Sequence, residues 1–204
     1  MGYYNTFITD LIENKAERKG FDNVLETSQT LDRNLFLGEI CDETGSMVDT
    51  AIRFWNKVDE EGNIPVEERQ PIKLYIDSPG GSLLSTFTMI DSIKASKTPV
   101  WTINVGCAYS GGFFTFICGH RRLAYPHASF LYHEGNAGTS GTASQFANFA
   151  AFYKKQLEKL KTIVLTNTKI TEETYNNIQK DDFWMTAEEA IDLGCADEII
   201  TELI

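Results

Sequence analysis

The sequence predicts an α/β fold with a largely parallel sheet, whose strands are joined by right-handed helical crossovers. Two observations support this class. Short β-branched runs such as Val100 to Val105 alternate with segments whose apolar residues recur every three or four positions, such as Leu83 to Ala95. Turn-forming residues separate the two kinds of segment, as in Asp77-Ser78-Pro79-Gly80-Gly81.

The first elements follow a polar, irregular N-terminal arm of residues 1–30. A strand is expected at Asn34 to Ile40, because the run is largely apolar, and it should end near Asp42-Glu43-Thr44-Gly45. Met47 to Val58 has the apolar recurrence of a helix. The acidic stretch Asp59 to Gln70 contains a glycine and a proline, so we expect an exposed loop with solvated carboxylates.

The central elements surround two turns. Ile72 to Ile76 is predicted to be a short buried strand that ends at the Asp77–Gly81 turn. The helix Leu83–Ala95 should then end at Lys97-Thr98-Pro99, with Val100 to Val105 as the next strand. The inward-facing residues of this helix are expected to be Leu83, Leu84, Phe87, Ile90 and Ile93.

The last third contains the longest helix. It follows a predicted buried helix at Phe113 to Cys118, strands at Leu123–Tyr125 and Ser129–Tyr132, and a glycine-rich link. A capping box, Thr142-x-x-Gln145, opens this long helix at about residues 142–168. Its apolar positions 146, 149, 150, 153, 157, 160 and 164 form one stripe. A second capping box, Thr186-x-x-Glu189, begins a helix that Gly194 should end.

Composition excludes several classes of function. The 204 residues suffice for one domain plus an arm, and the net charge of −11 argues against nucleic-acid binding. No apolar run is long enough to span a membrane, and the N-terminus lacks a signal-peptide core. Four scattered cysteines indicate buried thiols in a reducing, cytoplasmic compartment. His120, His127 and His133 lack the spacing of a helical metal pair, so we expect no metal site and no cofactor.

One turn has the pattern of a nucleophile site. Ala108-Tyr109-Ser110-Gly111-Gly112 directly follows a predicted strand and precedes a predicted helix. Such a turn holds a serine hydroxyl clear of the backbone, and the glycine amides that follow can stabilise an oxyanion. Serine and glycine are also ordinary turn residues, so the motif needs supporting groups.

Three further groups could complete a serine hydrolase site. His133 follows an apolar strand and could act as a base, although a buried, hydrogen-bonded histidine is the plainer interpretation; His120 and His127 look like surface positions. Asp181 and Asp182 could orient the histidine, or could be capping or solvated charges. The Ser78–Gly81 turn could supply amides at a helix N-terminus, or could be a plain strand-to-helix turn.

These motifs together resemble the proteolytic subunit of Clp proteases. The resemblance rests on Ile76–Ser82, Ala108–Gly111, Leu131-Tyr132-His133-Glu134 and Trp184–Ala190, in the family's order, and on the Gly194-Cys195-Ala196-Asp197 ending. It covers roughly residues 31 to 200. It implies a ClpP/crotonase-like spiral of repeated β-β-α units with a protruding long handle helix, so that residues 31–204 form the catalytic domain and residues 1–30 a pore loop or propeptide.

The resemblance also implies a serine endopeptidase. It assigns Ser110 as nucleophile, His133 as general base and Asp182 as the orienting acid, with Asp181 as the fallback. The oxyanion hole would use the backbone N–H groups of Gly81 and Gly111. The implied assembly is a double heptameric ring that encloses the active sites and degrades unfolded proteins fed by a Clp-type AAA+ unfoldase.

Three departures from the family pattern leave alternatives open. The Ser-Gly-Gly turn is closer to signal-peptide-peptidase-like relatives, which use a lysine base. In this chain Lys154 or Lys155 would then be the base. The acidic stretch Asp59–Gln70 looks longer than the family's connection, near where unfoldase docking pockets form, and the link before Asp181 looks short. Other candidate functions are a catalytically silent ring subunit, a processing protease such as a virus-associated maturation protease, and an acyl-CoA enzyme of the crotonase type.

Overall fold

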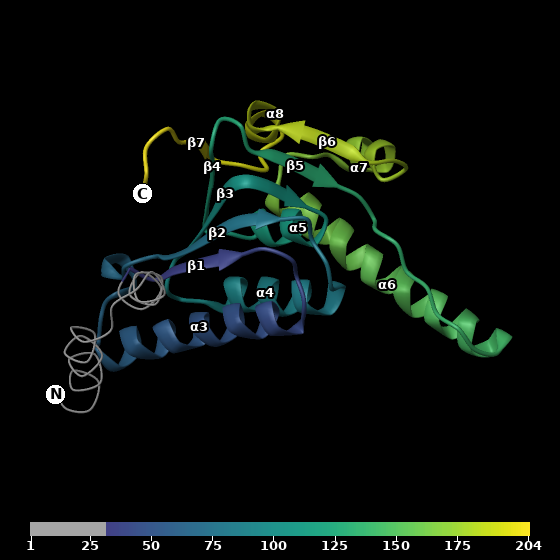
Figure 1. Ribbon diagram of the computed structural model, residues 1–204, viewed down its shortest axis with the longest axis horizontal. Coiled ribbons are helices and arrows are strands. Elements are labelled where there is room, and N and C mark those ends of the chain that lie inside the picture. The colour runs from purple at the N-terminus through teal and green to yellow at the C-terminus, as the bar shows by residue number, and fades with distance from the viewer. Residues whose placement is uncertain (1–31) are drawn as a thin grey trace, which may run out of the picture.

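The computed structural model describes residues 32–204 as one seven-stranded sheet with helices packed against it (Figure 1). The expected N-terminal arm, residues 1–30, lies outside the described residues. Helices α3 (Asp42–Glu61) and α4 (Leu83–Ala95) lie side by side along one face of the sheet, and α6 (Ala143–Asn167) projects away from the body. The protruding helix and the α/β class confirm the expected fold.

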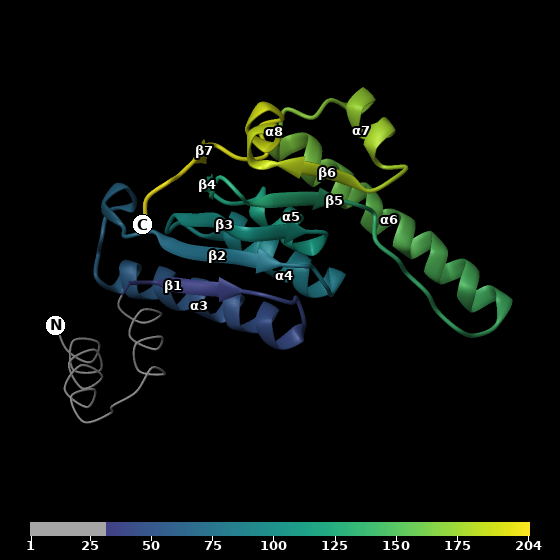
Figure 2. The same cartoon turned by 45° about the horizontal axis from the view of Figure 1, so that its top comes forward.

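The sheet is parallel along its main path, as expected. Its order is β1-β2-β3-β4-β7, from the strands β1 (Asn34–Leu37), β2 (Ile72–Ser78), β3 (Val100–Tyr109), β4 (Arg121–Ala124) and β7 (Glu198–Ile199). Strand β5 (Ser129–Tyr132) pairs in parallel with β3, and β6 (Phe183–Thr186) pairs antiparallel with β5. Figure 2 shows these two strands beside α8 (Ala187–Asp192), with α7 (Glu172–Ile178) at the same end.

Strand β3 changes partner along its length. Its first half, Trp101–Asn104, pairs with β4, and its second half, Cys107–Tyr109, pairs with β5. The register against β2 shifts at the same place, since Ile76 faces Asn104 whereas Ser78 faces Ala108. The extra residues form a bulge, which re-aims a strand. The prediction of a strand that ends at Val105 was therefore too short, because the chain stays extended up to Tyr109.

Helix α3 begins earlier than predicted. The residues expected to end a strand, Asp42 to Gly45, form its first turn, because the Thr44 hydroxyl accepts a hydrogen bond from the Cys41 amide at 2.9 Å. Gly45 is buried there, and a Cβ built on it would lie 2.8 Å from Ser85 Cβ of α4. Glycine at this position lets the two helices approach closely, which a turn-forming interpretation of Gly45 misses.

The acidic stretch after α3 is not uniformly solvated. Asp59 is fully buried in the last turn of α3, which corrects the expectation of an exposed loop from Asp59 onward. Its two carboxylate oxygens accept hydrogen bonds from Arg33 at 2.7 and 2.8 Å, and Thr98 donates a third at 2.7 Å. Arg33 also stacks on the Trp55 ring at 4.5 Å. This pair joins the start of β1 to α3 and to the turn before β3.

Helices α4, α5, α6 and α8 follow the predictions with small shifts, whereas α7 was not predicted. Helix α4 has the predicted bounds, but Leu84 is 68% exposed instead of inward-facing. Helix α5 (Gly111–Phe116) begins two residues before the predicted start. The Thr142–Gln145 and Thr186–Glu189 capping boxes both form, as predicted. The stripe of α6 is buried only in its second half, at Leu160 and Val164, and Phe146 is exposed.

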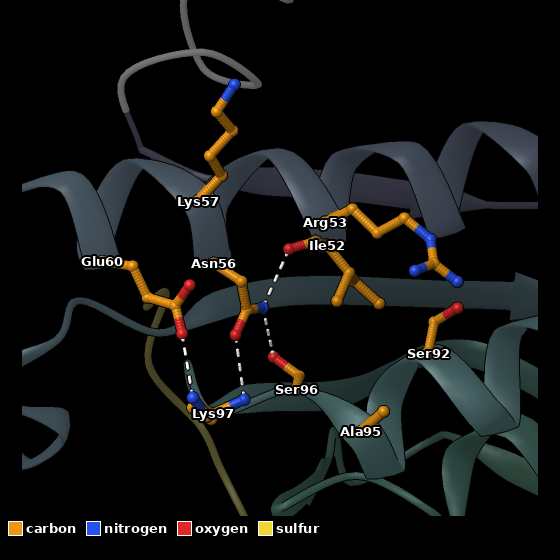
Figure 3. A pocket seen from close by; sticks show the side chains of 9 residues that line it. All are labelled: Ile52, Arg53, Asn56, Lys57, Glu60, Ser92, Ala95, Ser96 and Lys97. Carbon is orange, nitrogen blue, oxygen red and sulfur yellow. Dashed lines mark hydrogen bonds and ion pairs between the residues drawn. The ribbon is translucent and has the colours of Figure 1, made fainter.

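Asn56 links the second half of α3 to the C-terminal end of α4 through hydrogen bonds. Its amide nitrogen donates to Ser96 Oγ at 2.6 Å, and its amide oxygen accepts from the Lys97 amide at 2.9 Å (Figure 3). Glu60 pairs with the Lys97 ammonium at 2.9 Å beside it. The hollow of about 340 Å³ between the helices is therefore crossed by side chains that bind each other.

Asp59→Ala should destabilise the fold by about 3–5 kcal/mol, because it leaves the Arg33 guanidinium buried without its partner. Burial opposes ionisation of Asp59, but the hydrogen bonds from Arg33 and Thr98 outweigh it and lower the pKa of the carboxyl. The stability that the ionised Asp59 carboxylate contributes should therefore be fully present at neutral pH and should be lost as the pH falls below about 4. Urea unfolding at several pH values measures both effects. Glu60→Ala, which changes a half-exposed carboxylate one residue away, should cost less than about 1 kcal/mol; equal losses for the two variants would contradict the role of the buried pair.

Candidate functional site

Ser110 stands at the sharp turn between β3 and α5. Its φ of 53° and ψ of −120° are unusual for a residue with a side chain, and strained backbone of this kind is frequent at functional sites. The Ser110 amide donates to the Leu131 carbonyl of β5 at 2.9 Å, which fixes the turn. Ser110 is half-buried and lines a cleft of about 450 Å³.

The turn after β2 packs directly against the Ser110 turn. Gly80 and Gly81 both have positive φ, at 97° and 146°. A Cβ built on Gly80 would lie 2.6 Å from Ser110 Cβ, and one built on Gly81 would lie 2.1 Å from the Ile40 carbonyl oxygen. Both positions therefore require glycine: a side chain at Gly80 would push the two turns apart, and one at Gly81 would push the first turn away from Ile40.

Two backbone amides near Ser110 have no acceptor among the described residues. Ile40 holds the first turn through its own amide, which donates to the Gly80 carbonyl, and through its carbonyl, which accepts from the Ser82 amide, both at 2.8 Å. This pairing leaves the Gly81 amide unused, and Gly111 is the first residue of α5, where an amide has no acceptor within the helix. The hydrogen bonds found within residues 32–204 use neither amide. A Cβ built on Gly111 would lie 3.6 Å from the Gly81 nitrogen, so the two N–H groups are neighbours.

The register of β5 and β6 brings His133 opposite Asp182. Tyr132 faces Phe183 in this antiparallel pair, so His133, one residue later, faces Asp182, one residue earlier. The His133 Nδ1 to Asp182 Oδ1 distance is 3.7 Å, and the two side chains are 28% and 57% exposed. Asp181 is exposed and forms no ion pair with His133 among the described residues. The geometry thus favours Asp182 over the fallback.

The cleft contains the other predicted site residues as well. Gly81, Ser110, Gly111 and His133 all line it, together with apolar side chains from α4, α5 and α6. A serine hydroxyl, an imidazole and two backbone amides without an acceptor thus meet in one cleft, which is the combination of groups that a serine hydrolase requires. Within the described residues no hydrogen bond joins the Ser110 hydroxyl to His133, and catalytic hydrogen bonds can tighten only in a complex.

The alternative bases lie elsewhere. Lys154 and Lys155 are exposed on α6, and neither lines the cleft. His120 accepts a hydrogen bond from the Val100 amide at 3.0 Å and His127 is exposed, which agrees with the expectation that both are surface positions.

In residues 32–204 no three metal-ligating side chains gather at one place. All four cysteines are free, but only Cys118 and Cys195 are buried, whereas Cys41 and Cys107 are half-exposed. Burial raises the pKa of the Cys118 and Cys195 thiols to about 12, so neither is a reactive thiolate at neutral pH. None of the helices in this range combines the length and apolar character needed to cross a bilayer.

Two cleft residues were missed by the sequence analysis. Tyr153 was assigned only to the apolar stripe of α6, yet it lines the cleft, and its hydroxyl donates to the Glu134 carbonyl at 3.1 Å. Glu134, next to His133, was noted only as part of a motif. A tyrosine in an otherwise aliphatic and phenylalanine stripe was the available signal, because a buried phenol requires a hydrogen-bond partner.

Comparisons with known proteins agree with this geometry. The model of a family described as Clp protease matches residues 65–203. The ATP-dependent Clp protease proteolytic subunit 2 of Corynebacterium glutamicum is 31% identical over 201 residues, which cover 96% of this chain and 94% of that protein. The ATP-dependent Clp protease proteolytic subunit 3 of Rhizobium etli is 34% identical over 137 residues, or 65% of this chain and 69% of that protein. The chain therefore belongs to the Clp protease family of serine-type peptidases.

Proposed function

We propose that this chain is an endopeptidase that hydrolyses unfolded polypeptides with Ser110 as nucleophile, His133 as general base and Asp182 as the group that orients the histidine. The observation that carries the proposal is the meeting of Ser110, His133 and two free backbone amides in one cleft, with Asp182 opposite His133. Ser110, His133 and Asp182 each come from a different turn or strand end.

The residues would act in a fixed order. His133 takes the proton of the Ser110 hydroxyl as its oxygen attacks the peptide carbonyl carbon, and the carbonyl oxygen becomes an oxyanion. The Gly81 and Gly111 amides donate to that oxyanion. His133 then gives the proton to the leaving amine, and water releases the acyl group from Ser110 by the same steps. Asp182 accepts a hydrogen bond from Nδ1 and stabilises the imidazolium.

The distance between His133 and Asp182 is longer than this mechanism requires. A hydrogen bond needs the His133 and Asp182 atoms to move from 3.7 Å to about 2.6–3.2 Å. Both side chains are partly exposed at strand ends, so a small rotation of either one suffices. We propose that this contact closes when substrate or neighbouring subunits exclude water from the cleft.

We further propose that the chain works in a double heptameric ring in the cytoplasm and receives substrate from a Clp-type AAA+ unfoldase. The names of the two relatives describe proteolytic subunits of an ATP-dependent protease. This sequence has no Gly-x-x-x-x-Gly-Lys-[Ser/Thr] loop, so an ATP-driven step would have to come from a partner. The exposed Phe146 and Phe152 on the projecting half of α6 suit a contact between subunits, and the free cysteines suit a reducing compartment.

Labelling with a fluorophosphonate probe tests the nucleophile and the base. The native protein should be labelled in a ring-sized fraction, Ser110→Ala should not be labelled, and His133→Ala should be labelled far more slowly. Turnover of a peptide substrate should fall on the order of 10⁴- to 10⁶-fold in both variants. Mass spectrometry of the labelled peptide identifies the modified residue.

Other outcomes would favour the alternatives. An assembled ring that is never labelled supports a silent subunit, and labelling that survives His133→Ala supports a lysine base. Activity on a few folded precursors, without binding of a Clp unfoldase, would support a processing protease.

Substitution of each of two adjacent aspartates distinguishes an orienting role of Asp182 from a general effect of negative charge near His133. Asp182→Asn should lower kcat about 10⁴-fold, because the amide no longer stabilises the required tautomer and the imidazolium. Asp181→Asn makes the same change one residue away and should stay within about threefold of the native rate. Peptide hydrolysis by the two assembled variants measures the difference. A larger loss for Asp181→Asn would assign the role to Asp181 instead.

A further inference from the structure

Glu134 is the one residue with a fixed charge among those that line the cleft. It follows the proposed base, His133, and is half-buried. The cleft contains no lysine or arginine that could neutralise it. Glu134 is thus the carboxylate that lines the space beside Ser110, whereas Asp182 is near His133 but does not line the cleft.

The Glu134 carboxylate also has no ionic partner elsewhere in residues 32–204, whereas other partly or fully buried carboxylates do. Asp59 is paired with Arg33, and Asp49 is paired with Arg53. A half-buried carboxylate without a cation loses hydration without compensation, so a cation brought by a ligand would be favoured there.

Tyr153 supplies a second acceptor in the same cleft. Its hydroxyl hydrogen is committed to the Glu134 carbonyl at 3.1 Å, so the oxygen keeps its lone pairs for another donor. Burial, and in second place the charge of Glu134, raises the pKa of Tyr153, so the group stays a neutral phenol. The hydroxyl is thereby held as an acceptor and not as a donor.

Apolar side chains form the rest of the wall. Phe114 of α5 and Leu160 of α6 are both 3% exposed, and Leu83 of α4 lies beside them. A cleft lined by apolar side chains together with a carboxylate residue and a tyrosine matches a side chain with a hydrocarbon stem and a cationic end. Lysine and arginine have this build, and they commonly bury the stem while the charged end finds a polar partner.

We propose that Glu134, assisted by Tyr153, is a specificity-determining residue that favours cleavage after lysine or arginine. The proposal rests on the catalytic role of Ser110 proposed above. The stem of the residue before the cleaved bond packs against Leu83, Phe114 and Leu160, and its cationic end binds the Glu134 carboxylate and the Tyr153 oxygen. An acidic side chain in this place is disfavoured by like charge.

Peptides that differ only at the residue before the cleaved bond test the preference. With lysine, norleucine and glutamate at this position, the native ring should have its highest kcat/KM for lysine and its lowest for glutamate. Glu134→Gln should lower kcat/KM for the lysine peptide about tenfold, the effect of one charge-assisted contact in a partly exposed site. The norleucine peptide should change less than twofold, and the glutamate peptide should be cleaved faster.

Two further variants make the test specific. Glu158→Gln removes one charge at an exposed position of α6 outside the cleft, and it should leave the order of the three peptides unchanged. Tyr153→Phe removes the second acceptor and should lower kcat/KM for the lysine peptide a few-fold, with little change for norleucine. A loss that is equal for all three peptides in Glu134→Gln would overturn the proposal.

Binding measurements test the specificity proposal independently of the proposed catalytic role of Ser110. Fluorescence anisotropy with Ser110→Ala measures the affinity for the same peptides without cleavage, and the lysine peptide should bind about tenfold tighter than the norleucine peptide. The double variant Ser110→Ala/Glu134→Gln should bind both alike. Equal binding in Ser110→Ala would overturn the specificity proposal, whereas absent fluorophosphonate labelling of the native protein would overturn the catalytic one.

Discussion

The site depends on the close approach of two backbone turns, Gly80-Gly81 and Ser110-Gly111. A Cβ on Gly80 would meet Ser110 Cβ at 2.6 Å, and a Cβ on Gly111 would meet Thr86 Oγ1 at 2.5 Å. A side chain at Gly80 would therefore displace the Ser110 turn, and one at Gly111 would displace that turn from α4. The contact also fixes the direction of the free Gly81 and Gly111 amides, because backbone donors have no rotamers. Preorganised donors of this kind stabilise a developing charge without reorganising as the reaction proceeds.

The bulge in β3 supplies the other half of the site. The register shift between Asn104 and Ala108 lies where β3 exchanges its pairing with β4 for its pairing with β5. Beyond it, the Ser110 amide donates to the Leu131 carbonyl, and His133 follows two residues later on the same strand end. The antiparallel β6 then presents Asp182 from the far side. Three residues distant in sequence are brought together by sheet register, and no long loop is needed to place them.

The sequence analysis succeeded where local patterns decide the structure. The bounds of α4 and the Thr142 capping box depend on residues a few positions apart, so they could be predicted. It failed where partners are distant: Asp59 appeared solvated because Arg33 lies 26 residues earlier. Gly45 appeared to belong to a turn because its contact, Ser85, is in another helix. For the site, the motifs indicated the candidate residues, but the presence of Tyr153 and Glu134 in one cleft depends on how α6 lies against the segment that follows β5.

Backbone groups and side chains of the site are held in position by different interactions. The Ser110 turn and both amides are fixed by backbone hydrogen bonds and by glycines that admit no side chain, so few single substitutions can loosen them without a loss of folding. His133, Asp182 and Glu134 instead project from strand ends as partly exposed side chains. Substitution there is structurally tolerated, because little packing is lost. The positions of the two amides are thus built into the fold, whereas the proposed base, its proposed partner and the proposed specificity residue are three side chains that can change independently of it.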